Sequence, residues 1–139
     1  MADITIGTNG ISVVHADRAE IVDMIAVEAI AAGQPVYQTS AGKAGIADAN
    51  AAGKQQFRGI ALKATAAGKA CPVLKRGFLS GFVLSGVAYD GIVYLSDTAG
   101  SLADAAGTMT VNCGRVVGMT DPDITKILSV DADWVRAWA

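Results

Sequence analysis

The sequence predicts an all-β fold, a small β-barrel or sandwich of short antiparallel strands with N- and C-terminal extensions. Short runs rich in Val, Ile, Leu and Phe recur along the 139 residues, and 16 glycines indicate many turns. Strand-length apolar runs with turn residues at intervals of roughly 8 to 15 residues are typical of barrels and sandwiches. The expected strand segments are 11–16, 34–39, 57–62, 71–77, 77–84, 92–96, 109–118 and 124–130.

Residues 1–25 are predicted to form an N-terminal arm or an added strand. Residues 1–14 alternate and carry few charges, so a free backbone edge here would be prone to pair with another chain. Two placements stay open: an arm or strand that lies on a neighbouring molecule, and a strand of the chain's own barrel. The apolar residues expected to make contact in the first placement are Ile4, Ile6, Ile11 and Val13.

Residues 17–33 have a helix-forming composition, but their side chains form no clear helical stripe. Ile21, Asp23 and Ile25 alternate with Val22 and Met24. We therefore predict a strand or an extended arm here rather than a helix.

The tripeptide Ala-Ala-Gly occurs four times and ends at Gly33, Gly53, Gly68 and Gly107. A phosphate-binding P-loop needs an earlier glycine and a Ser or Thr after its Gly-Lys pair, and neither Gly-Lys pair among these copies has them. The unequal spacing of the copies argues against a solenoid. Because glycine adopts positive φ without steric cost, we interpret the copies as hairpin turns, in which the chain reverses just before a strand. Asp90-Gly91 is interpreted in the same way, as a hairpin turn.

The composition limits the class of partner. Charged residues make up only 17% of the chain, which predicts that another chain covers part of the surface. The net charge is −2 and no basic cluster exists beyond Lys75-Arg76, so no nucleic-acid partner is expected. No apolar run reaches 18 residues and no secretory signal is visible, so we expect no membrane partner and synthesis in a cytoplasm. Cys71 and Cys113 are accordingly predicted to be reduced, buried thiols.

No residue pattern points to catalysis. His15 and Asp17 would share a strand face, but no nucleophile elbow of the G-x-S-x-G type exists, so His15 is interpreted as a lone surface or interface residue. One histidine and two distant cysteines give no zinc motif. Asp121 and Asp123 flank a proline and are interpreted as a solvated turn rather than a cation site. The sequence predicts no enzyme activity, no catalytic or metal-binding residues and no cofactor.

Several motifs, in their order and spacing, resemble a known family over about residues 26–131. They are Gly33 with Pro35–Tyr37, then Gly59–Ala61, then Val93–Ser96 followed by Thr98, Gly100 and Leu102, and finally GRVVG from Gly114. In this respect the chain resembles the small capsid-decoration, or cement, proteins of tailed bacteriophages. Residues 1–25 and the tail 132–139 lie outside the resemblance.

The resemblance implies a β-barrel-like decoration domain over residues 26–131 and a non-enzymatic role. It implies a homo-oligomer, with a trimer favoured over a dimer, that binds the outer surface of an assembled phage head. There it would bridge subunits of the major capsid protein and stabilise the shell. The expected location is the virion, after synthesis in the host cytoplasm.

The C-terminal tail, residues 132–139, contains both tryptophans of the chain, Trp134 and Trp138. Two interpretations stay open. The tail either folds back over the end of the barrel or anchors a neighbouring subunit or the capsid, because large aromatic residues dominate interface hot spots. If it is an anchor, truncation after Asp133 is expected to weaken oligomerisation or capsid binding.

One function from another class is kept as an alternative: a small-ligand or carbohydrate-binding β-barrel module. A sugar site presents exposed aromatic side chains above polar ones. Tyr37, Tyr89 and Tyr94 lie within strand-like apolar runs, which argues against this alternative.

Overall fold

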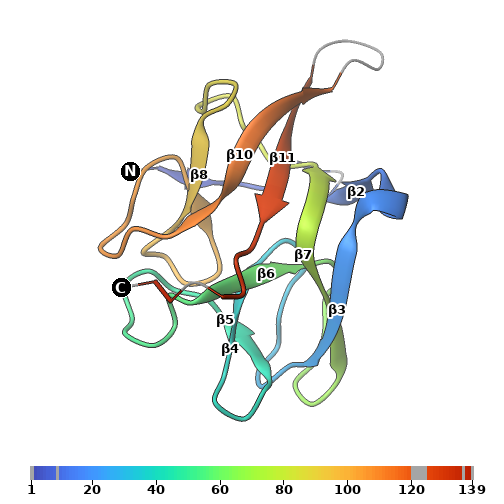
Figure 1. The fold of residues 1–139 in the computed structure, drawn as a ribbon, viewed down its shortest axis with the longest axis vertical. Helices are drawn as coiled ribbons and strands as arrows, with labels where there is room; N and C mark the ends of the chain where they lie inside the picture. The colour runs from blue at the N-terminus through green and yellow to red at the C-terminus, as the bar shows by residue number, and fades with distance from the viewer. Residues whose placement is uncertain (1, 9, 120–124, 136, 139) are drawn as a thin grey trace.

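Eleven antiparallel strands form one strongly curled half-barrel sheet, which confirms the predicted all-β class (Figure 1). The computed structural model describes residues 2–8, 10–119, 125–135, 137 and 138. Within these ranges the helical content is a single 3-10 turn, η1, at Ala16–Arg18. The strands are β1 (Asp3–Ile4), β2 (Ser12–Val14), β3 (Glu20–Ile25), β4 (Pro35–Gln38), β5 (Ala44–Ile46), β6 (Phe57–Ala61), β7 (Ala70–Ser80), β8 (Ile92–Leu95), β9 (Leu102–Ala103), β10 (Asn112–Met119) and β11 (Thr125–Asp131).

Strand β7 is the centre of the sheet. The strands follow the order β1-β9-β8-β10-β11-β7-β6-β4-β5, and both β2 and β3 also pair with β7. The N-terminal half of β7 therefore lies between β3 and β6, and its C-terminal half lies between β2 and β11. In Figure 1, β7 runs through both halves of the molecule and connects them.

The expected division of this region into strands 71–77 and 77–84 is wrong, because β7 continues through Gly77 as one strand. Gly77 has a φ of 149°, and a Cβ there would lie 3.1 Å from a methyl carbon of Leu74. Glycine adopts this conformation without strain, so β7 can bend at this point without ending.

The prediction of strand rather than helix in residues 17–33 is confirmed. Glu20–Ile25 forms β3, and it pairs with β7 from Ala70 to Arg76. The preceding turn, η1, follows His15, which adopts a left-handed φ of 57°. This residue ends β2 and redirects the chain into β3.

Isolated bridges bring together segments of the curled sheet that are not neighbours in the strand order. Ile6 pairs with Phe82, Ala26 with Ala44, and Ile30 with Thr65. The first bridge places the N-terminal segment beside the end of β7, and the second places the end of β3 beside β5. These contacts explain how one sheet encloses apolar side chains on its inner face.

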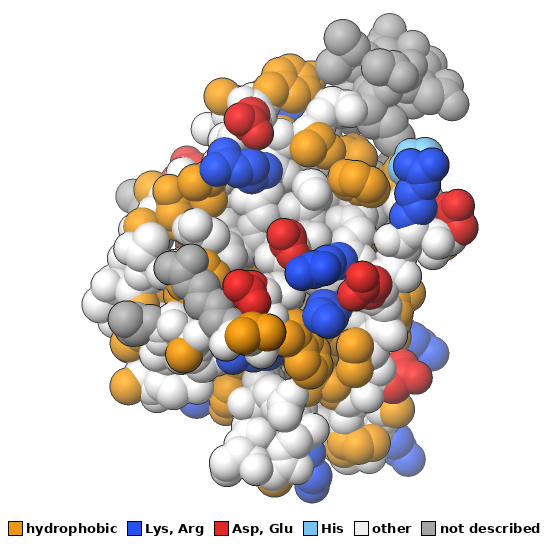
Figure 2. Space-filling model, viewed as in Figure 1, with side chains coloured by type: hydrophobic (Ala, Val, Ile, Leu, Met, Phe, Trp, Pro, Cys, Tyr) orange, Lys and Arg blue, Asp and Glu red, His pale blue; other side chains and the backbone are white. Residues whose placement is uncertain are grey.

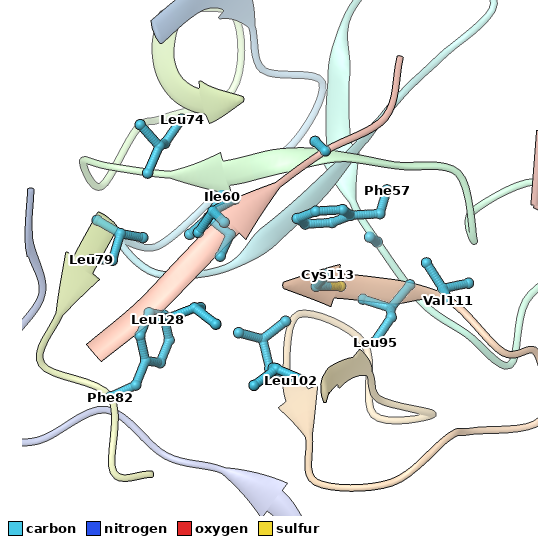
Figure 3. Close-up of a cluster of buried hydrophobic side chains, with 14 of the residues drawn as sticks. Phe57, Ile60, Leu74, Leu79, Phe82, Leu95, Leu102, Val111, Cys113 and Leu128 are labelled. Atoms are coloured by element: carbon cyan, nitrogen blue, oxygen red, sulfur yellow. The ribbon is translucent and has the colours of Figure 1, made fainter. Parts of the chain in front are cut away.

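The core consists of two clusters of buried side chains. The larger one lies among β6, β7, β8, β9, β10 and β11, and Figure 3 shows Phe57, Ile60, Leu95 and Leu128 pointing toward its centre. The smaller one includes Met24, Val36, Ala44 and Val73 between β3, β4, β5 and β7. Both thiols are buried as predicted, Cys113 in the first cluster and Cys71 in the second.

Three of the four Ala-Ala-Gly copies lie in turns as predicted, but the hairpin interpretation holds only for the copy that ends at Gly68, which connects the paired strands β6 and β7. Gly33, Gly53 and Gly68 have φ values of 88°, 88° and 85°, and each lies in a turn before a strand or the approach to one. Gly107 has no left-handed φ; it lies where a Cβ would be 2.6 Å from a carboxylate oxygen of Asp97. The close approach of the Asp97 carboxylate therefore explains the glycine at position 107.

Asp90 has a φ of 62° and lies in a turn before β8, as the Asp-Gly pair predicted. The hairpin expected around it is wrong, because β8 pairs with β9 and β10 and not with the preceding strand β7. The Asp-Gly signal identifies the turn, whereas the sheet order decides which strands become neighbours.

Candidate functional site

The N-terminal segment lies in the chain's own sheet, which was one of the two placements left open. Ile4 pairs with Leu102 of β9, and Val13 pairs with Leu79 of β7. Ile4, Val13 and Ile11 are partly buried and pack against the larger core cluster. Of the four predicted contact residues in this segment, Ile6 is the most accessible, with 40% of its surface exposed.

Two carboxylates hold this segment in place. The backbone N–H of Ala2 donates to Asp104 Oδ1 (2.8 Å), and the N–H of Asp104 donates to the carbonyl oxygen of Ala2 (3.1 Å). The buried hydroxyl of Ser96 donates to Asp3 Oδ1 and accepts from the N–H of Thr98. These hydrogen bonds fix β1 against β9 at one edge of the sheet.

The C-terminal tail folds back over the sheet and places Trp138 in the core. The side chain is 7% exposed and belongs to the larger core cluster. Gln56 Nε2 donates to the carbonyl oxygen of Trp138 (2.7 Å), and the N–H of Trp138 donates to Gln56 Oε1 (2.7 Å). Gln55 Nε2 donates to the same carbonyl oxygen at 3.2 Å. The glutamines before β6 therefore hold the end of the tail.

Trp134 covers the outside of the same region. Its indole N–H donates to the carbonyl oxygen of Arg58 (2.8 Å), and Lys75 Nζ lies 5.6 Å from the ring centroid. The guanidinium of Arg58 donates to the carbonyl oxygen of Asp133 at 3.1 Å. These contacts agree with the interpretation that the tail folds back over the barrel. Contact of either tryptophan with another molecule stays a prediction.

The residues considered for catalysis are not brought together. His15 is exposed and packs edge-on against Phe78, with ring centroids 6.2 Å apart. Within the ranges that the structure describes, no three His, Cys, Asp or Glu side chains lie close enough to hold a metal ion. Burial raises the pKa of the Cys113 thiol well above its ordinary value, so this thiol stays protonated. Asp121 and Asp123 lie outside the described residues.

A recess of about 300 Å³ lies on the outer face of β8, β10 and β11. Gly114 contributes no side chain to it, and ion pairs stand at two of its borders: Arg115 with Asp90 (3.9 Å) and Arg76 with Asp131 (2.9 Å). Figure 2 shows acidic and basic side chains interleaved over β11, β7 and β3 on this face. The lining residues are Asp90, Ile92, Asn112, Gly114, Arg115, Val117, Ser129 and Asp131.

Strand β3 presents an apolar surface that was not predicted from the sequence. Ile21 is 48% exposed, Ile25 is 41% exposed, and Val27, just after the strand, is 43% exposed. The inward residues Val22 and Met24 pack in the smaller core cluster. Because β3 carries apolar side chains on both faces, its sequence shows no alternation of apolar and polar residues. Apolar residues on both faces of a single strand are also the signal that could have predicted an exposed contact surface here.

Among the described residues, no helix is both long and apolar enough to cross a membrane. Comparisons of the chain with protein-family models, with curated proteins and with solved structures find no match. A functional conclusion for this chain therefore depends on its own residues and their arrangement.

Proposed function

We propose that the protein is a decoration protein of a tailed-bacteriophage capsid. In this proposal it binds the outer surface of the assembled head as a homo-oligomer and bridges subunits of the major capsid protein. It acts without catalysis and without a cofactor, and it is made in the host cytoplasm before it joins the virion. The trimer that the resemblance favours is part of the proposal.

The observation that carries the proposal is the position of the resembling motifs in the fold. Pro35–Tyr37 lies in β4, Gly59–Ala61 lies in β6, and Val93–Ser96 spans β8 and the residue after it. Each of these motifs thus supplies a strand of the same sheet. Motifs that form the framework of one domain support a resemblance at the level of the whole domain better than motifs scattered over loops.

The surface fits a protein that works through many weak contacts. Charged residues make up 17% of the chain, and large apolar side chains are exposed on β3 and next to β7. Linked copies make each further contact effectively intramolecular, so avidity can exceed single-site affinity by roughly 10² to 10⁴. Such a protein holds shell subunits together with no single strong site.

Co-sedimentation with capsids that lack decoration tests the proposal. The purified protein is expected to pellet with assembled shells and to saturate at a fixed ratio to the major capsid protein. Ile6→Lys introduces a charge at the most accessible of the predicted N-terminal contact residues and is expected to reduce pelleting. Gln38→Lys adds the same charge at another exposed position and serves as the control. If the unaltered protein stays in the supernatant at all concentrations, the proposal is wrong.

A second candidate, a small-ligand or carbohydrate-binding module, is favoured by the recess beside Gly114. Its lining combines two carboxylates, an arginine, an asparagine and a serine with two apolar side chains, a mixture that suits a polyol. A ligand-dependent rise in melting temperature with a panel of monosaccharides, lost in Arg115→Ala, would support this candidate. A panel without effect would count against it.

A further inference from the structure

We propose that the free edge of β3 pairs with the same edge of a second copy of this chain, in a two-fold antiparallel arrangement centred on Asp23. The proposal goes beyond the proposed function, because a two-fold contact joins two copies of the chain and is not a contact within a three-fold trimer. The open backbone edge of β3, its register with β7 and the exposed side chains on it carry the proposal.

One hydrogen bond establishes which way the backbone groups of β7 point. The N–H of Leu62 donates to the carbonyl oxygen of Pro72 (2.9 Å), so Pro72 directs its carbonyl toward the β6 side. Successive residues of an antiparallel strand direct their N–H and C=O groups to opposite sides. Cys71 and Val73 therefore direct theirs toward β3.

The register transfers this alternation to β3. Val73 pairs with Val22, and Cys71 pairs with Met24, so these two residues of β3 face β7. The residues between and beside them, Ile21, Asp23 and Ile25, direct their N–H and C=O groups to the opposite edge. Within the part of the chain that the structure describes, no other strand pairs with β3.

The chain itself limits this edge at both ends. On one side the N–H of Ala19 donates to the carbonyl oxygen of Ala16 (3.3 Å). On the other side the N–H of Val27 donates to the carbonyl oxygen of Ala44 in β5 (2.9 Å). Between these two bonds lies a short open edge, and an uncovered edge is a template for pairing with another chain.

The open length selects one two-fold register. With the axis at Asp23, Ile21 of one copy lies opposite Ile25 of the other, and Asp23 lies opposite its own equivalent. A shift of the axis by one residue in either direction brings Ala19 or Val27 into the ladder, and their N–H groups are already donated. The central register alone uses only the three open residues.

The side chains at this register are partly complementary. Ile21 and Ile25 are 48% and 41% exposed, and the pairing would bury them against each other on the outer face. Arg18 lies in η1, and the carboxylate of Glu28 accepts from the N–H of Ile46 (3.1 Å). Both residues are exposed and lie beyond opposite ends of the edge, so the antiparallel arrangement places opposite charges at each end of the contact. The two Asp23 carboxylates oppose this pairing, so we expect a reversible contact rather than a permanent one.

Solution mass by light scattering over a concentration series tests the contact. The unaltered chain is expected to reach the mass of a dimer, whereas the resemblance favours a trimer. Asp23→Pro removes an edge N–H that β7 does not use and is expected to give a monomer. Ile25→Lys, which keeps every backbone group, is expected to weaken dimerisation at least tenfold, while Val83→Lys, at a position 47% exposed outside β3, leaves the mass unchanged.

Two further variants test the register. Asp23→Asn removes the like charges and is expected to tighten dimerisation roughly two- to fivefold. Asp23→Cys places two thiols opposite each other at a Cα separation of about 5.5 Å, so oxidation is expected to link the dimer. Ile25→Cys is the matched control, because its own equivalent lies about 14 Å away at this register. The natural thiols Cys71 and Cys113 are both 0% exposed and do not compete.

A monomer at all concentrations overturns the inference, as does a trimer whose mass ignores both Asp23→Pro and Ile25→Lys. A monomer whose capsid binding falls in these variants also overturns it, and assigns the edge to a capsid strand instead. A dimer that fails to pellet with capsids keeps this inference and rejects the proposed function. Circular dichroism of Asp23→Pro shows whether its monomer is folded, and Ile25→Lys decides the result if it is not.

Discussion

Gln56 satisfies both backbone groups of Trp138 with one side-chain amide. Its Oε1 accepts from the N–H of Trp138, and its Nε2 donates to the carbonyl oxygen, both at 2.7 Å. The two residues are separated by 82 positions in the chain, so this pair closes the C-terminal tail onto the start of β6. The indole can lie in the core because its backbone is satisfied at the same point.

Gln56→Ala is therefore expected to destabilise the protein and loosen the tail. Two hydrogen bonds at roughly 0.5 to 1.5 kcal/mol each give a loss of about 1 to 3 kcal/mol in the free energy of unfolding. Urea unfolding followed by tryptophan fluorescence measures this loss. Faster release of Trp138 by a carboxypeptidase would report a loosened tail.

Gln56→Glu is the matched control for this prediction. The carboxylate keeps an acceptor for the N–H of Trp138 but has no donor for its carbonyl oxygen. A loss comparable to that of the alanine variant would assign the stabilisation to the donated bond. If both variants unfold like the unaltered protein, the amide pair contributes nothing, and the indole of Trp138 and the hydrogen bonds of Gln55 and Arg58 hold the tail.

Strands with an apolar run bounded by turn residues could be predicted from the sequence. The segments expected at 34–39, 57–62 and 92–96 correspond to β4, β6 and β8 within one residue at each end. Their local signals agree with their position in the sheet, because each has buried residues bounded by glycine, proline or polar residues.

The features that were predicted wrongly or missed depend on residues that are distant along the chain. A glycine usually marks the end of a strand, but Gly77 lets β7 bend and continue because β3, β6, β2 and β11 support it on both sides. The exposed face of β3 was also missed, because Ile21 and Ile25 look like core residues until the sheet shows which side they occupy. The buried position of Trp138 depends on Gln56, and no local sequence pattern connects these two residues.

Gly81 is expected to be essential to the placement of the N-terminal segment. It has a φ of 105°, and a Cβ there would overlap the carbonyl oxygen of Gly10 and lie 2.8 Å from Cα of Ile11. Gly81→Ala is therefore expected to lose more than the roughly 1 to 3 kcal/mol that backbone strain alone costs, because the N-terminal segment must also move away. Chemical unfolding measures the loss, and protease accessibility of residues 2–14 reports the displacement.

Gly42→Ala separates strain from close approach. Gly42 also has a left-handed φ, 80°, but a Cβ added there would meet nothing within 4 Å. Its substitution is expected to cost only the backbone strain of roughly 1 kcal/mol. Equal losses for the two variants would mean that the N-terminal segment does not pack on Gly81 in solution.

The buried thiol of Cys113 predicts a loss of stability at alkaline pH. Burial raises its folded-state pKa well above the ordinary 9.0, whereas the unfolded chain releases the proton near that ordinary value. The contribution of this thiol to the free energy of unfolding is fully present below about pH 9. It falls as the pH rises toward the folded-state pKa, because only the unfolded state then loses the proton. Within that window the slope is about 1.4 kcal/mol per pH unit.

The difference between the unaltered protein and Cys113→Ala isolates this effect, because every other titrating group is common to both. The stability advantage of the cysteine is expected to be constant from about pH 7 to about pH 8.5 and to shrink above about pH 9. Val116→Ala, a 0% exposed position in the same strand β10, removes apolar volume without removing a thiol and is expected to give a pH-independent difference. A thiol that ionises in the folded state at its ordinary pKa would make the two difference curves parallel, and it would also react with a thiol reagent without unfolding.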